Sequence, residues 1–172
     1  MRGAGLLLVA ALAAACGAQE RVSLPDAELV EDRERLADQK IRDRDPSAIQ
    51  EYRVAIGIAT SRMRTISTDM RDELFAAQNP PRGAPMRDLS GYADWRNAVN
   101  QLLLAMSPEE RQYFTGLVRE LSSRERENLQ FRYSRSSSFE REAAVRRLQS
   151  DLPDWRRLAQ AVRRMEAKCR EC

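Results

Sequence analysis

The sequence predicts an all-α protein, and three observations carry this prediction. Apolar residues recur at alternating steps of three and four along several segments, which is the spacing of one helix face. No segment shows sustained alternation of apolar and polar residues, the pattern of a half-buried strand. Only seven glycines and seven prolines occur among the 172 residues, which is too few for a loop-rich β protein. This length allows one domain, or at most two small ones.

The clearest helix follows Asp45 and Pro46, because aspartate can cap a helix and proline fits its first position. A heptad stripe then runs to about Ala77. Its members are Ile49, Tyr52, Ile56, Ala59, Met63, Ile66, Met70 and Leu74.

A second helix with the same spacing is expected over residues 88–106. Its apolar stripe consists of Tyr92, Trp95, Val99, Leu102 and Met106. The proline-rich segment 79–85 separates the two helices. Two long helices joined by such a loop predict an antiparallel helical hairpin over about 46–106, to which several shorter helices are added in a bundle.

Shorter helices are expected on either side of this hairpin. The highly charged segment 26–45 predicts a solvated helix with one narrow packed edge. That edge is formed by Leu29, Val30, Leu36, Ala37 and Ile41. Ser107 and Ser122 are each followed three residues later by glutamate, the capping-box signature of a helix start. The segment beginning at Ser137 starts another helix, which Pro153 is expected to divide from a final one.

The composition argues against several kinds of catalytic site. Histidine is absent, which excludes Ser/His and Cys/His catalytic pairs and zinc sites that contain histidine. Phosphate-binding glycine loops are absent as well. Paired carboxylates such as Asp72-Glu73 and Glu109-Glu110 are expected on polar, solvated helix faces. We therefore expect a protein that is not an enzyme and has no catalytic residues, cofactor or metal.

The charge distribution does not favour a nucleic-acid partner. The chain has 29 basic and 26 acidic residues, a net charge of +3, and the two signs are interspersed. Binding to nucleic acid requires a clustered basic surface.

The N-terminus has the features of an export signal. An apolar run of ten residues, Leu6 to Ala15, is too short for the roughly 20 residues of a bilayer-spanning helix but fits a signal peptide. The sequence Leu-Ala-Ala-Ala-Cys-Gly over 12–17 resembles the lipobox of bacterial lipoproteins, with Ala13 where the family prefers leucine. Ordinary secretion without a lipid, with cleavage after Ala15 or Ala18, is the alternative.

The lipobox resemblance implies a location and a division of the chain. Residues 1–15 would be the signal peptide, and Cys16 would carry a diacylglycerol and an acylated amino terminus. Residues 16–25 would form a lipidated tether, and 26–172 a single periplasmic domain. Because Gly17 stands where aspartate would retain the protein in the inner membrane, the resemblance implies the periplasmic face of the outer membrane.

Three cysteines occur in the chain, and lipidation of one would leave a pair. Cys169 and Cys172 would then remain, three residues apart on one helix face. The oxidising periplasm favours a disulfide between them. Intermolecular bridging, metal binding and redox chemistry are the alternatives, although a single pair lacks the four ligands of a structural zinc site.

Two segments spaced by 15 residues carry a second resemblance. Met-Ser-Pro-Glu-Glu-Arg at 106–111 and Leu-Ser-Ser-Arg-Glu-Arg at 121–126 resemble the Leu-Thr-x-x-Gln repeats of Spy/CpxP-type periplasmic chaperones, with Ser for Thr and Glu for Gln. They also resemble the Leu-Ser-Pro-Glu-Glu-Arg repeats of a family of exported helical proteins. Helix capping alone would explain the same residues.

The chaperone resemblance implies a surface that binds unfolded or envelope proteins. Met63, Ile66 and Met70 are the candidate partner-binding residues, because methionine side chains adapt to varied partners. Core packing is the alternative role for this stripe.

The resulting expectation is an outer-membrane-anchored periplasmic lipoprotein that acts as a non-enzymatic protein-binding module. It would be a chaperone-like factor or an accessory subunit of an envelope assembly, attached to the membrane through the lipid on Cys16. A coiled-coil-like spacer or homodimer without client binding, or a pilotin-like escort of a secretin, is the alternative.

Overall fold

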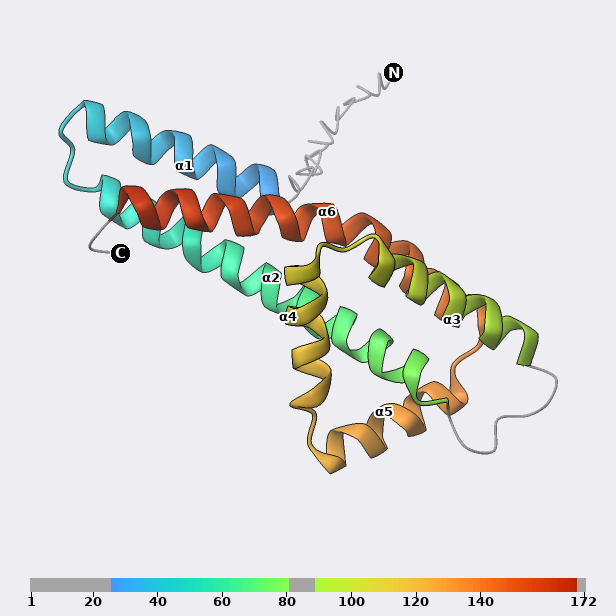
Figure 1. The fold of residues 1–172 in the computed structure, drawn as a ribbon. Coiled ribbons are helices and arrows are strands. Elements are labelled where there is room, and N and C mark those ends of the chain that lie inside the picture. Colours follow the sequence, from blue (N-terminus) through green and yellow to red (C-terminus); the bar gives the residue numbers. More distant parts are fainter. Residues whose placement is uncertain (1–25, 81–88, 170–172) are drawn as a thin grey trace, which may run out of the picture.

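A computed structural model describes residues 26–80 and 89–169 of the chain. Over these residues it contains six helices and no strand, so the all-α, bundle-like fold class is confirmed (Figure 1). The helices are α1 (Asp26–Arg42), α2 (Ala48–Gln78), α3 (Leu89–Leu104), α4 (Pro108–Arg119), α5 (Ser123–Arg135) and α6 (Ser138–Lys168). The predicted signal peptide, Cys16, the tether and Cys172 lie outside the described residues.

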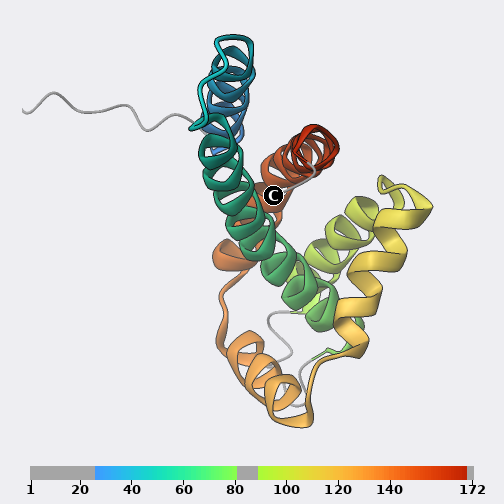
Figure 2. The same cartoon turned by 90° about the vertical axis from the view of Figure 1, so that its left-hand side faces the viewer.

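Two 31-residue helices, α2 and α6, form the spine of the molecule. α2 contacts every other helix. α1 lies beside α2 and α6 at one end of the spine, and α3, α4 and α5 gather toward the other end (Figure 1). Seen from the side, α5 lies at the edge of the bundle (Figure 2).

The predicted hairpin is part of this larger arrangement. Helices α2 and α3 run in opposite directions and contact each other (Figure 1). The connection between them, 81–88, lies outside the described residues. Because α2 also packs against α1 and α6, both sides of this long helix are covered, and the hairpin does not stand alone.

The spine carries two hydrophobic cores. The larger one joins the C-terminal half of α2 to α3, α4, α5 and the first half of α6, and aromatic and leucine side chains dominate it. The smaller one joins α1, the first half of α2 and the second half of α6. Alanines form much of it: Ala27, Ala37, Ala55, Ala59 and Ala161. Small side chains allow close helix approach but bury little apolar area, so polar contacts carry more of the attachment of α1.

A serine caps the start of each of the three helices α4, α5 and α6, as predicted. The hydroxyl groups of Ser107, Ser122 and Ser137 each accept the backbone N–H of the glutamate three residues later. Each glutamate carboxylate accepts the serine N–H in return, at 2.9, 2.9 and 2.7 Å. These contacts satisfy two backbone donors at each helix start, and they confirm the predicted beginnings of α4, α5 and α6.

Pro153 does not divide the last helix, contrary to the prediction. It lies inside α6, which continues from Ser138 to Lys168. An internal proline removes one backbone hydrogen bond and strains the preceding turn. Buried residues on both sides of it, Leu148 and Leu152 before and Leu158 after, lie in the two cores that pack on α2. This tertiary packing outweighs the local cost of the proline.

The packed edge of α1 differs in part from the predicted one. Val30 and Ala37 are buried as expected, but Leu36 and Ile41 are 41% and 49% exposed. The buried edge is completed instead by Ala27 and by a charged residue, Glu34. No described helix combines the length and apolar character required to cross a bilayer.

The first turns at the α1–α2 connection also differ slightly from expectation. α2 begins at Ala48 rather than Pro46. Asp45 still caps the turn, because its carboxylate accepts the N–H of Ser47 at 2.8 Å. Arg44, just before it, has a φ of 56°, in the left-handed region that non-glycine residues rarely adopt.

Candidate functional site

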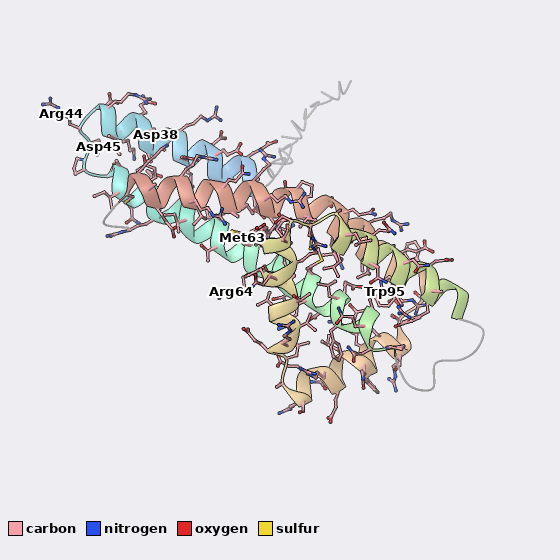
Figure 3. All side chains as sticks on the ribbon, viewed as in Figure 1. Asp38, Arg44, Asp45, Met63, Arg64 and Trp95 are labelled. Carbon is pink, nitrogen blue, oxygen red and sulfur yellow. The ribbon has the colours of Figure 1, made fainter. Side chains whose placement is uncertain are left out.

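The predicted partner-binding residues of α2 do not form an exposed surface. Ile66 and Met70 are fully buried, and Met63 is half-buried against the smaller core. Figure 3 shows Met63 midway along α2, where this helix passes between the two cores. Ile66 and Met70 face packed neighbours, so their assignment is corrected to core packing, and the assignment of Met63 stays a prediction.

Cys169, at the end of α6, is disulfide-bonded and only 8% exposed. Its backbone N–H donates to the carbonyl of Met165 at 2.8 Å, which closes the last turn of the helix. The predicted partner, Cys172, lies outside the described residues, so the pairing of these two cysteines stays a prediction.

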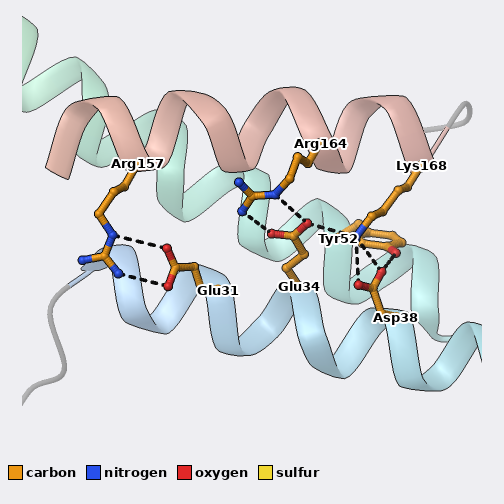
Figure 4. A network of polar contacts seen from close by, with 7 residues as sticks. All are labelled: Glu31, Glu34, Asp38, Tyr52, Arg157, Arg164 and Lys168. Carbon is orange, nitrogen blue, oxygen red and sulfur yellow. Dashed lines mark hydrogen bonds and ion pairs between the residues drawn. The ribbon is translucent and has the colours of Figure 1, made fainter. Parts of the chain in front are cut away.

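Ion pairs attach α1 to α6 along the smaller core (Figure 4). Arg157 donates to Glu31 at 3.0 Å, and Arg164 donates to Glu34 at 2.8 Å. Lys168 bridges two carboxylates, at 3.0 Å from Glu34 and 2.8 Å from Asp38. The contacts recur along α1, so they fix its direction as well as its position.

Two carboxylates of this cluster, Glu34 and Asp38, have lowered pKa values that favour their charged form. Burial alone would raise the pKa of Glu34, but hydrogen bonds and positive charge from Arg164 and Lys168 outweigh it and lower that pKa. For Asp38 the same competition, with Lys168 and the hydroxyl of Tyr52 as donors, also lowers the pKa. Burial, together with this contact to Asp38, raises the pKa of Tyr52 to about 12. The cluster is a structural attachment with every carboxylate occupied.

A different polar cluster lies at the other end of the spine, around Glu73 of α2. Its carboxylate is buried, and it accepts hydrogen bonds from the indole N–H of Trp95 at 3.0 Å and from the hydroxyl of Tyr133. The ring of Trp95 stacks on that of Tyr133 with centroids 5.7 Å apart, and the ring of Tyr92 lies tilted against Trp95 at 5.2 Å. Figure 3 shows Trp95 far along the molecule from Asp38, so the two clusters are separate.

Burial is the main influence on ionisation in this second cluster. It raises the pKa of Glu73 in spite of its two hydrogen bonds and the nearby charges of Arg132 and Arg147. Burial and the adjacent Glu73 raise the pKa of Tyr133 as well. The neighbouring Asp72 is also buried and is paired with Arg71 and Arg132, at 2.8 and 3.0 Å. The prediction that Asp72 and Glu73 lie on a solvated face is therefore wrong.

Glu73 is one of the residues that line an open hollow of about 410 Å³ at the junction of α5 and α6. Four arginines and one further glutamate line it. The complete lining is Glu73, Arg132, Tyr133, Arg135, Ser136, Glu140, Arg141, Ala144 and Arg147. Guanidinium groups in such a concave site can hold anionic groups through paired hydrogen bonds.

Two exposed aromatic side chains lie next to this hollow in the sequence. Phe131, near the end of α5, is 59% exposed, and Phe139, in the first turn of α6, is 71% exposed. The hollow residues Arg132, Arg135 and Glu140 are their near neighbours in the sequence. We refer to residues 131–147 around the hollow as the α5–α6 corner, and it is the candidate functional site.

Sequence reasoning did not identify this corner. Glu73 meets its partners Trp95 and Tyr133 across 22 and 60 residues of chain, and no local pattern indicates such distant contacts. The one local signal was the position of two phenylalanines beside arginines near a serine-rich helix start. Within residues 26–80 and 89–169, no group of three or more potential metal ligands occurs.

Comparison with known proteins adds no relative: no family model, no curated protein and no solved structure matches this chain.

Proposed function

We propose that this protein is an exported lipoprotein, anchored to the periplasmic face of the outer membrane, whose helical body binds other envelope proteins without catalysis. The lipobox-like sequence ending at Cys16 supports the anchor. Three acyl chains would make that anchor effectively permanent, because each buried methylene group contributes about 0.8 kcal/mol. The tether over 16–25 would hold the helical body within roughly 30 Å of the membrane.

The α5–α6 corner is the proposed contact surface for a partner, and the observation that carries this assignment is the exposure of its aromatic residues. Aromatic side chains are enriched at protein interfaces and are otherwise mostly buried. Here Tyr52, Phe75 and Phe114 are fully or almost fully buried, whereas Phe131 and Phe139 are mainly exposed. Arginine, which is also enriched at interfaces, lines the hollow, and one of these arginines, Arg135, lies over the ring of Phe131.

A photo-reactive amino acid placed at position 139 tests this function in intact cells. We expect it to cross-link to an envelope protein, because residue 139 is mainly exposed at the proposed surface. The matched control is Gln160, an exposed position of the same helix outside the corner. The absence of cross-linked partners at 139, or the same products at both positions, would contradict the proposal.

Aggregation assays and light scattering on the purified chain distinguish a chaperone-like factor, an accessory subunit and a dimeric spacer. A chaperone-like factor should suppress aggregation of an unfolded client at near-stoichiometric ratio, whereas an accessory subunit should not. Cross-links at 139 between two copies of the chain, together with a dimer in light scattering, would instead indicate the spacer alternative.

A further inference from the structure

We propose that the hollow of the α5–α6 corner binds an acidic peptide segment of the partner. Its arginines would hold the carboxylates of this segment, and Phe131 and Phe139 would contact its apolar side chains. This inference rests on the proposed function and adds the chemistry of the partner.

The charge balance of the hollow favours an anionic ligand. Four guanidinium groups and two carboxylates line it. Both carboxylates are already engaged: Glu73 accepts from Trp95 and Tyr133, and Glu140 accepts from the N–H and hydroxyl of Ser137 at 2.7 and 2.9 Å. Arg132 is in addition paired with Asp72 at 3.0 Å, so the excess positive charge of the hollow lies on its other arginines.

Two of the arginines are available to a ligand. Arg135 and Arg147 are exposed, and neither forms an ion pair with any residue in 26–80 or 89–169. The Arg135 guanidinium lies 4.1 Å from the ring centroid of Phe131. A cation–π contact uses the face of the guanidinium and leaves its in-plane N–H donors for a carboxylate.

The walls of the hollow are held in place before any ligand arrives. Arg141 is only 4% exposed and donates to the carbonyl of Ser136 at 2.6 Å. The hydroxyl of Ser136 donates to the carbonyl of Tyr133 at 2.9 Å. These contacts join the end of α5 to the start of α6. A preorganised site loses less conformational freedom on binding than a flexible one.

The combination of features favours a peptide over a phosphate ion or a lipid surface. A free phosphate would use the arginines but not the exposed phenylalanines. A flat anionic membrane would meet the rim of the hollow but not its concave interior. An extended peptide with acidic and apolar residues would use both the guanidinium groups and the aromatic rings.

Titration calorimetry with the purified full chain tests this proposal. The probe is a short, end-blocked peptide that alternates glutamate and leucine, and its comparison peptide has glutamine at every glutamate position. We expect only the glutamate peptide to bind. The double variant Arg135→Gln/Arg147→Gln should weaken binding by about tenfold or more, because charge-assisted hydrogen bonds are lost.

The matched control is Arg64→Gln/Arg163→Gln. It removes the same charge from exposed positions on α2 and α6 that do not line the hollow, and it should bind the glutamate peptide as the unaltered chain does. Equal binding of the two peptides, or equal loss in both double variants, would overturn the proposal. So would competition by inorganic phosphate or by phosphatidylglycerol vesicles, which would indicate an ion site or a membrane surface.

The two proposals fail in different ways. Cross-links from position 139 without binding of the glutamate peptide would refute only the acidic chemistry of the partner. Peptide binding that depends on Arg135 and Arg147, without any cross-linked envelope protein, would refute the proposed function and leave an anion-binding hollow.

Discussion

Replacement of Glu34 by glutamine should loosen the attachment of α1 to the rest of the molecule. The side chain of Glu34 is 7% exposed, and its carboxylate accepts hydrogen bonds from Arg164 at 2.8 and 3.3 Å and from Lys168 at 3.0 Å. Glutamine keeps the size of the side chain but removes its charge. The substitution therefore tests the ion pairs and leaves the packing nearly unchanged.

The size of the effect follows from the exposure of the partners. A hydrogen bond to a charged group contributes about 1.5–3 kcal/mol when it is buried, whereas exposed ion pairs contribute about 0.2–1 kcal/mol. The side chains of Arg164 and Lys168 are 48% and 40% exposed, so water screens part of the interaction. We expect a total loss of about 1–2 kcal/mol, or a decrease in Tm of about 2–8 °C for a chain of this length.

The loss should depend on pH in a defined direction. The pKa of Glu34 is lower in the folded protein than its ordinary value of 4.5. Its contribution to stability is therefore complete above the pKa of the unfolded chain and disappears as the pH falls through the lower folded pKa. The difference between the unaltered protein and Glu34→Gln should be largest near neutral pH and should vanish in strong acid.

Thermal unfolding followed by circular dichroism at neutral and acidic pH measures this difference. The control is Glu142→Gln, because Glu142 pairs with Arg146 at 3.5 Å and both side chains are about 60% exposed. It should change stability by less than about 0.5 kcal/mol. If Glu34→Gln is as mild as this control at neutral pH, or if its effect persists undiminished in acid, the reasoning is refuted.

Other substitutions test the core, the internal proline and the buried cluster by urea denaturation. Ile66→Ala should destabilise the protein by about 2–5 kcal/mol because the side chain is fully buried, and Met63→Ala at a half-buried position should cost less. Pro153→Ala should stabilise the protein by up to about 3 kcal/mol, because it restores a backbone N–H inside α6. Tyr133→Phe should cost about 1–3 kcal/mol, since it removes a buried donor to Glu73.

Each of these substitutions has a contrary outcome. If Ile66→Ala left the stability unaltered, the heptad residues of α2 would not be packed in the core as described. A loss of stability in Pro153→Ala would mean that the proline conformation itself is required in α6. For Tyr133→Phe the comparison is Tyr113→Phe, because Tyr113 is 44% exposed and its hydroxyl lies 3.3 Å from that of Ser67. Equal effects of the two would show that the hydrogen bond to Glu73 has no special weight.

Local sequence signals were sufficient to locate most helices. The serine–glutamate spacing at Ser107 and Ser122 predicts helix starts because both partners of the capping box lie within four residues. Pro153 misled the prediction for the opposite reason. Its local cost is real, but the packing of α6 on α2, on both sides of the proline, decides the outcome.

Local sequence patterns could not predict the polar clusters, because the residues that form each cluster are far apart in the chain. Glu34 meets Arg164 and Lys168 across 130 and 134 residues, so nothing near Glu34 indicates that an acid belongs to the packed edge of α1. The heptad stripe of α2 had a related ambiguity. Its spacing predicts that Ile66 and Met70 share a face, but spacing alone does not tell whether another helix or a partner protein covers that face.

The most direct test of the whole account is the mass of the chain isolated from its native cells. We expect it in the outer-membrane fraction, with the mass of residues 16–172 plus three acyl chains, and we expect Cys16→Ser to abolish both the lipid and the membrane association. A polypeptide with the mass of the unprocessed, unmodified chain, recovered from the cytosol, would contradict the anchor, the location and the proposed envelope partners together.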